Sequence, residues 1–328
     1  MGLAPPLLDV RRALCALTTR SVISIPKRNQ PMDDEITTRN PPVVRLQSPL
    51  NCDCNATDNC SCNTHKQSTA VAPQYVYAIG KISWRFPNDG VEREFVQIRS
   101  RVDTNGKADS EVAHAIFSDR QYRYLVRELC WILSVEGMPA YVLLPRDAAD
   151  FDLLVEATRP NPARADFDVA IGRRGALSAP ETSRGFELPT LLLTQVYSFA
   201  QEALIKSLSA RLDDHARVQY DNVARGVFEQ VASLSDNIGG TDEDRALNYL
   251  SVRFAPLYDH TVALSREQFS LASISRRSST VSERRRIVDV ILTYTSRVTG
   301  IDNRFLVRVD VTNEFPFLAS KLMPFIET

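Results

Sequence analysis

Residues 75–86 read YVYAIGKISWRF, and the pattern of a folded protein begins here. Aromatic and β-branched residues alternate along this stretch, which predicts a β-strand. We interpret FVQIRSRV at 95–102 as a second strand. Further on, apolar residues at helical spacing from Tyr122 to Leu133 predict a helix, and Ser118 with Gln121 forms the capping box expected at its beginning.

The next segments repeat a strand and helix order. AYVLLP at 140–145 and DFDVAIG at 166–172 predict strands, and residues 147–157 between them predict a helix. This alternation indicates a small α/β sandwich over residues 73–175. The stretch RRGALSAPETSRGFELP at 173–189 contains glycine and proline and is predicted to join this module to the next.

Residues 186–328 have a more helical pattern. Three helices are predicted, followed by two alternating strands that form a hairpin around TGIDN, and these elements cover 191–208, 220–240, 243–254, 285–296 and 304–313. Thr241 with Asp244 caps the third helix. The predicted fold class is therefore α+β, a small α/β sandwich followed by a helical module that ends in an antiparallel β-hairpin.

The composition is that of an ordinary globular protein. The 328 residues include 39 basic and 40 acidic side chains, which gives a net charge of −1. Such a balance creates no general attraction to nucleic acid or to anionic membranes, so neither is expected as a partner. No window approaches the roughly 18 consecutive apolar residues of a membrane span. These features predict a cytoplasmic protein, in which thiols stay reduced.

Residues 1–72 are rich in proline and cysteine and are predicted to be a mostly disordered tail and linker. NCDCNATDNCSCNTHK at 51–66 contains two Cys-x-Cys pairs, and four thiolates satisfy the tetrahedral preference of zinc. The ligands of this predicted structural zinc site are Cys52, Cys54, Cys60 and Cys62, with His65 as an alternative ligand. A thiol-rich linker without metal fits the spacing equally well, and disulfides are disfavoured.

The sequence contains no recognisable catalytic motif. Its four histidines do not form HExxH, and there is no GxSxG, GxGxxG or phosphate-binding loop. His260 adjoins Asp259 and fits a general base, but a structural histidine is the favoured interpretation. Cys130 is interpreted as a core residue. SRRSSTVSERRRI at 275–287 fits a peptide-docking or phosphate-contact loop, and an exposed connection is favoured. A non-enzymatic protein is therefore favoured.

Several of these stretches together resemble one protein family. They are QYVYAIGKISWRFPNDGVEREFVQ, DRQYRYLVRELCWILSVEGMPAYVLLP, DRALNYLSVRF and the terminal VDVILTY and NRFLVRVDVTNEFP strands. In order and spacing they are similar to the C-terminal region of the cyanobactin maturation protease PatG family, a domain of unknown function that divides into two modules. The resemblance begins near residue 50. It implies a PatG_D-like module at 73–175 and a PatG_C-like module at 186–328.

The resemblance also implies a function. In that family the region follows a subtilisin-like domain that cleaves and macrocyclises a precursor peptide, and the Asp, His and Ser blocks of a subtilisin are absent from this sequence. We therefore expect a non-catalytic accessory protein of ribosomally made, modified peptides. Its expected partner is a precursor peptide or a modifying enzyme, and a homodimer is one expected arrangement. The strand region TGIDNRFLVRVDV at 299–311 is the predicted peptide-docking edge.

Two other classes of function remain open. One is a metal-dependent enzyme that uses the Cys52–Cys62 cluster with His260 or His114 as a proton shuttle. The other is a stand-alone scaffold or regulatory protein. The first requires an open coordination position on the metal, which four protein ligands do not leave.

Overall fold

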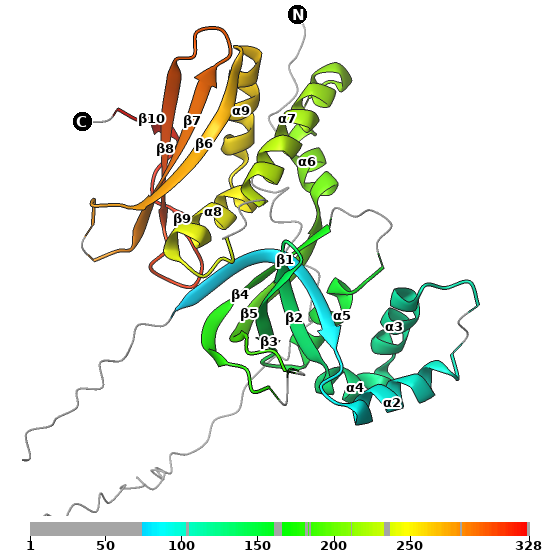
Figure 1. Cartoon of the computed structure of the whole chain (residues 1–328). Helices are drawn as coiled ribbons and strands as arrows, with labels where there is room; N and C mark the ends of the chain where they lie inside the picture. Colours follow the sequence, from blue (N-terminus) through cyan, green and yellow to red (C-terminus); the bar gives the residue numbers. More distant parts are fainter. Residues whose placement is uncertain are drawn as a thin grey trace, which may run out of the picture. The chain divides into compact units, whose positions relative to one another are not determined.

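The computed structural model describes residues 74–326 except 103–104, 161–165, 181–182, 184, 211, 233–236 and 283. This part of the chain contains two β-sheets and the helices that pack on them (Figure 1). The predicted α+β class is confirmed. Among these residues no helix combines the length and the apolar character needed to cross a membrane.

The first sheet closes into a five-stranded barrel. Its strands are β1 (Tyr75–Arg85), β2 (Cys130–Val135), β3 (Met138–Leu144), β4 (Asp166–Leu177) and β5 (Pro189–Ala200), and they pair in the order β1-β2-β3-β5-β4. Only the β3–β5 pair is parallel. This order, with a helix between β3 and β4, is the topology of an OB-fold barrel. The α/β module expected from the sequence therefore takes the form of a closed barrel.

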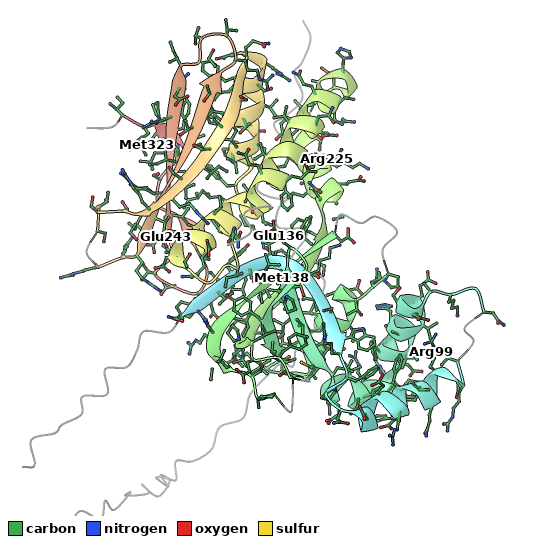
Figure 2. The ribbon with its side chains drawn as sticks, viewed as in Figure 1. Arg99, Glu136, Met138, Arg225, Glu243 and Met323 are labelled. Carbon is green, nitrogen blue, oxygen red and sulfur yellow. The ribbon has the colours of Figure 1, made fainter. Side chains whose placement is uncertain are left out.

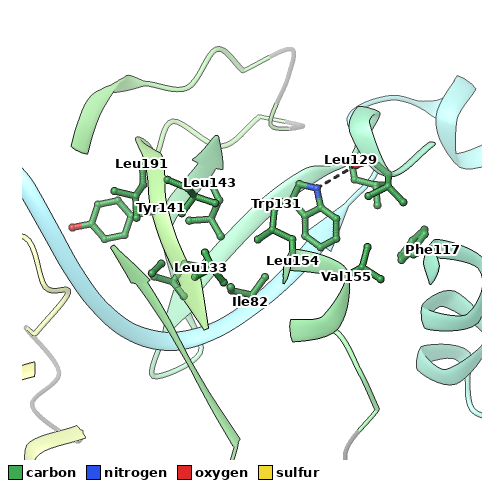
Figure 3. Close-up of a cluster of buried hydrophobic side chains, with 14 of the residues drawn as sticks. Ile82, Phe117, Leu129, Trp131, Leu133, Tyr141, Leu143, Leu154, Val155 and Leu191 are labelled. Atoms are coloured by element: carbon green, nitrogen blue, oxygen red, sulfur yellow. Dashed lines mark hydrogen bonds between the residues drawn. The ribbon is translucent and has the colours of Figure 1, made fainter. Parts of the chain in front are cut away.

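Alternate residues of each strand fill the barrel. Leu133, Tyr141, Leu143 and Leu191 are at most 2% exposed and meet in one cluster (Figure 3). Trp131 is also buried in this cluster, and its indole N–H donates to the Val126 carbonyl at 3.3 Å. Each of the three leucines stabilises the fold by about 1.5–3 kcal/mol through burial. The barrel interior is thus a packed core.

Helix α2 (Asp89–Arg99) overturns the strand predicted at 95–102. Asn88 caps it by accepting the Val91 N–H at 3.1 Å. Phe95 and Ile98 are its buried residues and lie three positions apart, which is helical spacing. The strand interpretation was wrong because eight residues are too few to separate the two periodicities when β-branched residues are present.

The helix predicted from Tyr122 to Leu133 is also shorter than expected. A short 3₁₀ turn leads into α4 (Arg123–Glu128), and Cys130–Val135 forms strand β2. The predicted capping box is wrong, because the Asp119 carboxylate accepts the Gln121 N–H at 3.0 Å. A strand that is buried on both faces gives a continuous apolar run, and such a run fits helical spacing equally well. Helix α3 (Asp109–Ser118), which the sequence did not suggest, precedes this turn.

The region at 173–208 differs most from the sequence prediction. The stretch 173–189 was expected to join the two modules. It contains instead the end of β4 and the connection to β5, and the strands β4 and β5 pair along most of their length. The first part of the helix predicted at 191–208 is β5, and only α6 (Gln201–Ser209) is helical. The barrel therefore extends to Ala200. The predicted helix α5 (Ala148–Ala157) is confirmed, with Asp147 as its cap.

The remaining chain forms a helical layer and an open sheet. The helices are α7 (Asp214–Ala232), α8 (Asp242–Arg253) and α9 (Ala255–Arg266); the strands are β6 (Phe269–Ser278), β7 (Ile287–Ser296), β8 (Asp302–Asp310), β9 (Phe317–Leu318) and β10 (Met323–Pro324). Thr241 caps α8 by accepting the Asp244 N–H at 3.1 Å, as predicted. Strands β7 and β8 are also confirmed, whereas α9 and β6 were not anticipated.

The helical layer completes one edge of the barrel. Strand β1 pairs with β4 over Tyr75–Gly80 and with β2 over Lys81–Arg85, so the first half of β1 has one edge without a strand. The Tyr77 N–H donates to the Gly239 carbonyl at 3.0 Å, and the Asn248 Nδ2 donates to the Tyr77 carbonyl at 2.8 Å. Gly239 has a φ of 73°, and a Cβ there would lie 2.2 Å from the Tyr77 oxygen, so only glycine fits.

Candidate functional site

The usual ligand face of an OB-fold barrel is covered in this protein. OB-fold proteins bind oligonucleotides and oligosaccharides on the face of β2 and β3. Here the connection between β4 and β5 lies over that face, where Leu188 packs against Ile132 and Val142. The Arg85 guanidinium carbon lies 4.5 Å from the centre of the Phe186 ring on the same connection. The face formed by β2 and β3 is therefore not open to a ligand.

The docking edge that the sequence predicted on β8 is not free. The sheet order is β10-β8-β7-β6, and β9 also pairs with β8. Thus Leu306 pairs with Met323 and Val309 pairs with Leu318, while β7 occupies the other side. The prediction was wrong because residues 317–324 return to β8 through contacts that a local pattern does not reveal.

Strand β6 is the open edge of this sheet. Within the described residues it pairs with β7 alone, through a ladder that ends where the Ser279 N–H donates to the Ile287 carbonyl at 2.7 Å. Antiparallel pairs alternate, so the amides of Ile274, Arg276 and Ser278 point away from β7. No described residue accepts a hydrogen bond from these three amides. This is a ready-made template for another strand.

The side chains of β6 hold the strand and give it positive charge. Arg276 Nη1 lies 2.6 Å from Asp244 Oδ1, and Ser278 Oγ donates to Glu243 Oε1 at 3.0 Å, which ties β6 to helix α8. On the other side, Arg277 lies 5.3 Å from the ring centre of Phe325 with its side chain 56% exposed. Arg285 of the following connection is 65% exposed. Arg277 Nε lies 3.8 Å from Asp289 Oδ2, and Arg285 Nη1 lies 3.8 Å from Asp310 Oδ2, so this end presents exposed guanidinium groups whose charge is partly balanced by buried carboxylates.

The predicted zinc ligands Cys52, Cys54, Cys60 and Cys62, and the alternative ligand His65, lie outside the described residues. Within the described part of the chain no group of three or more His, Cys, Asp or Glu residues is placed to hold a metal ion. The structural zinc site therefore stays a prediction.

The two histidines considered as proton shuttles lie in different modules and have different partners. His114 on α3 bonds the Val155 carbonyl through Nδ1 at 3.1 Å and Ser118 through Nε2 at 3.3 Å, which links α3 to α5. His260 on α9 packs with its ring centre 4.2 Å from that of Phe305, and burial lowers the pKa of its imidazole. These contacts favour structural roles for both.

The neighbours of the other candidate residues are also structural. Asp259, the expected partner of His260, instead accepts a hydrogen bond from the Tyr220 hydroxyl at 2.8 Å. Cys130 is buried, as predicted, and burial raises the pKa of its thiol, which disfavours the reactive thiolate.

Sequence reasoning missed a buried carboxylate in the barrel. Asp168 is 6% exposed, and its oxygens accept the Ile82 N–H at 2.7 Å and the Ser198 hydroxyl at 2.5 Å. Burial raises the pKa of this carboxyl to about 6, while the bonds from Ser198 and Ile82 oppose the shift. Ile82 pairs with Leu133 of β2, but β1 stops pairing with β4 at Gly80, so the Asp168 carboxylate replaces a backbone acceptor on the β4 side. Its role is to close the barrel.

Comparison with known proteins agrees with this architecture. A family model described as PatG Domain matches residues 75–229, and one described as PatG C-terminal matches residues 214–325. A solved structure named PatG Domain of Unknown Function is 18% identical and superposes with a TM-score of 0.58, covering 77% of this chain and 98% of that one. At that identity the similarity shows a shared fold. No curated protein matches this chain.

Proposed function

Residues 75–325 are a PatG C-terminal-like region, and from this premise we propose that the chain is a non-catalytic recognition protein for an extended peptide. The peptide would be the precursor in the maturation of a ribosomally made, modified peptide of the cyanobactin kind. A separately encoded enzyme would then act on it. The open edge of β6 is the observation that carries this proposal.

Strand addition suits the chemistry of this edge. An extended peptide gains affinity from main-chain hydrogen bonds, and specificity comes from the side chains beside it. Strand β6 has ten residues, which is long enough for a peptide of similar length to pair with the outward amides and carbonyls. Such pairing tolerates many peptide sequences, as a carrier of variable precursors requires.

The charge of the edge favours an acidic peptide. Arg277 and Arg285 are more than half exposed, and both lie at the end of β6 that leads into the connection to β7. Opposite charges at an interface raise the association rate and fix the register more than they raise affinity. We therefore expect carboxylates near one end of the bound segment, and binding that weakens with salt.

The test uses the full chain and a synthetic extended peptide of about ten residues with carboxylates near one end. Titration of ¹⁵N-labelled protein is expected to shift the amide signals of β6 and to protect them from hydrogen exchange. Absence of peptide binding would overturn the proposal. So would binding that leaves β6 unchanged and perturbs the barrel.

A matched pair of variants isolates the backbone contribution. Arg276→Ala and Arg276→Pro both remove the ion pair to Asp244, and only the proline also removes an outward N–H. This N–H does not take part in the β6–β7 ladder, so both variants are expected to fold. Proline is expected to weaken binding about tenfold more than alanine, which corresponds to about 1.4 kcal/mol for a lost hydrogen bond. Equal affinities of the two variants would contradict strand addition.

A further inference from the structure

A hollow rich in arginine lies between helices α4 and α5. Its volume is about 310 Å³, and the residues that line it are Arg120, Arg123, Arg127, Ala148, Phe151 and Asp152. We call it the arginine hollow. No residue of strand β6 belongs to this lining, so what the hollow binds is a question independent of peptide docking.

The spacing of the three arginines places them on one face. The 3₁₀ turn at Arg120–Tyr122 leads directly into α4, and the arginines follow one another after three and then four residues. Residues at this spacing lie on the same side of a helix. Leu125 and Val126 of α4 are at most 1% exposed and belong to the core. Their burial turns the row of arginines toward α5 and the solvent.

Two of the three guanidinium groups have no partner in the described structure. Arg123 Nη2 forms an ion pair with Asp152 Oδ1 of α5. No described residue forms an ion pair or a hydrogen bond with the side chains of Arg120 and Arg127, and both residues are exposed. Arg99 of α2, labelled in Figure 2, differs from them because an aspartate of α3 pairs with it. Arg120 and Arg127 are therefore available to a ligand.

The lining carries net positive charge. Its three guanidinium groups and one carboxylate together give a charge of +2. Arg123 and Arg127 are four residues apart, and like charges at this spacing destabilise a helix. A bound anion would remove this repulsion. A phosphate monoester carries about −1.5 to −2 charges at pH 7, which matches the charge of the lining.

The other carboxylates at the beginning of α5 lie outside the lining and have partners of their own. Asp147 caps the helix by accepting the Ala149 N–H at 2.8 Å, and Asp150 accepts the Arg146 N–H at 2.7 Å. Neither aspartate lines the arginine hollow. Among the described residues, Asp152 is thus the one carboxylate in the lining that opposes a bound anion.

The shape and chemistry of the lining suit a phosphate that carries a small organic group. A guanidinium group is planar and can donate two parallel hydrogen bonds to phosphate oxygens. Phe151, which also packs against the core, and Ala148 give the hollow an apolar wall. Cavities of about 150 Å³ in other proteins admit benzene, so about 310 Å³ leaves room for a ring beside the phosphate.

We propose that the arginine hollow binds a small phosphorylated molecule, a phosphate monoester with an apolar or aromatic group. The phosphate lies between Arg120 and Arg127, and the organic group packs on Phe151. A nucleic acid fits less well, because its row of phosphates requires a basic surface that extends over a whole face of the protein. The net charge of the chain is −1, which does not supply such a surface.

The first experiment titrates the full chain with two probes at low salt and about pH 7.5, where a phosphate monoester is mostly a dianion. Phenyl phosphate and benzenesulfonate have the same ring and a tetrahedral anion, but the sulfonate has a single charge. Phenyl phosphate is expected to bind at least about fivefold more tightly, because the second charge adds attraction. The Nε–H signals of Arg120 and Arg127 are expected to shift in NMR spectra. Equal binding of the two probes, no binding of phenyl phosphate, or tighter binding of a single-stranded RNA would overturn the proposal.

The second experiment changes the charge of the lining in both directions. Arg127→Gln removes an exposed guanidinium and is expected to weaken phenyl phosphate binding about tenfold. Arg101→Gln removes the same charge from an exposed residue that does not line the hollow, and is expected to change affinity by less than about twofold. Asp152→Asn removes the opposing carboxylate and is expected to tighten binding about threefold, a gain that a misfolded protein would not show. Affinity that is the same in Arg127→Gln and Arg101→Gln, or weaker in Asp152→Asn, would contradict a phosphate site in this hollow.

Discussion

The barrel and the open sheet treat their strand edges in opposite ways. In the barrel each strand pairs on both sides, and the remaining edge of β1 is bonded by Gly239 and Asn248. In the sheet, β9 and β10 cover one side, and β6 is left open on the other. Proteins usually protect such an edge, and here a bulge between Leu271 and Ser273 and two arginines protect it. These features disfavour pairing of β6 with the β6 strand of another copy, but they still allow it to pair with a peptide strand of opposite charge.

The largest expected effect comes from the two cores. Leu133→Ala in the barrel and Leu292→Ala in the sheet each remove a side chain that is at most 1% exposed, and each is expected to cost about 2–5 kcal/mol of the free energy of unfolding. Because Tyr249 and Val252 pack on Tyr77 and Ile79, we expect both variants to shift one shared transition in urea. Two separate transitions would show that barrel and sheet are independent.

The next largest expected effect is a dependence of folding stability on pH, caused by the Asp168 carboxyl that bridges β4 and β1. The folded pKa of Asp168 is about 6, above the ordinary value near 3.9, so the folded state holds this proton more tightly. Stability from this group is greatest below pH 4 and falls as the pH rises to about 6, by up to about 3 kcal/mol. Asp168→Asn is expected to flatten this part of the profile, measured by urea unfolding at pH 4 to 7. An unchanged slope would contradict the prediction.

A pair of glycine variants separates close approach from local flexibility. A Cβ at Gly80 would lie 2.2 Å from the Ser134 carbonyl oxygen across the β1–β2 pair, so Gly80→Ala is expected to cost about 1–3 kcal/mol. Gly226 in helix α7 has no atom within 4 Å of such a Cβ, so Gly226→Ala is expected to add about 0.5–1 kcal/mol. Thermal unfolding measures both. A loss of stability in both variants would mean that α7 is as tightly constrained as the barrel.

The smallest change in stability is expected at the open edge. Arg277→Val replaces a half-exposed arginine, so the free energy of unfolding is expected to change by no more than about 0.5 kcal/mol. Self-association is expected to rise, because a charge that protects the edge is lost. Sedimentation velocity measures it, with Arg297→Val in the turn after β7 as the control. Equal association of the two variants would show that β6 is not an exposed template.

The sequence predicted the elements whose signals are local. Strand β1 alternates, β7 and β8 form a hairpin around a turn, and Thr241 with Asp244 marks the beginning of α8. Strand β2 was interpreted as a helix because both of its faces are buried. Strand β5 was included in a helix because its apolar residues continue without a break into the helical pattern of α6. Strand β6 was missed because FSLASISRRS has the composition of a loop.

The candidate site was less predictable than the fold. Which strand is the open edge depends on β9 and β10 returning to β8, and no local pattern records that return. The role of Asp168 depends on β1 separating from β4 after Gly80, and no local pattern predicts where that separation occurs. Only the motif DFDVAIG, with an acid at an inward strand position, offered a signal.

The bonds that Tyr77 makes to Gly239 and Asn248 have a practical consequence for anyone who divides the gene. A recombinant fragment that stops at Ala200 would contain all five strands, but the backbone N–H and carbonyl of Tyr77 in β1 would lose their partners. We expect such a fragment to aggregate during expression, because a strand edge is exposed. A fragment that continues through Arg253 retains Gly239 and Asn248, which bond this edge. Truncation series should therefore be planned around α8 and not around the last strand of the barrel.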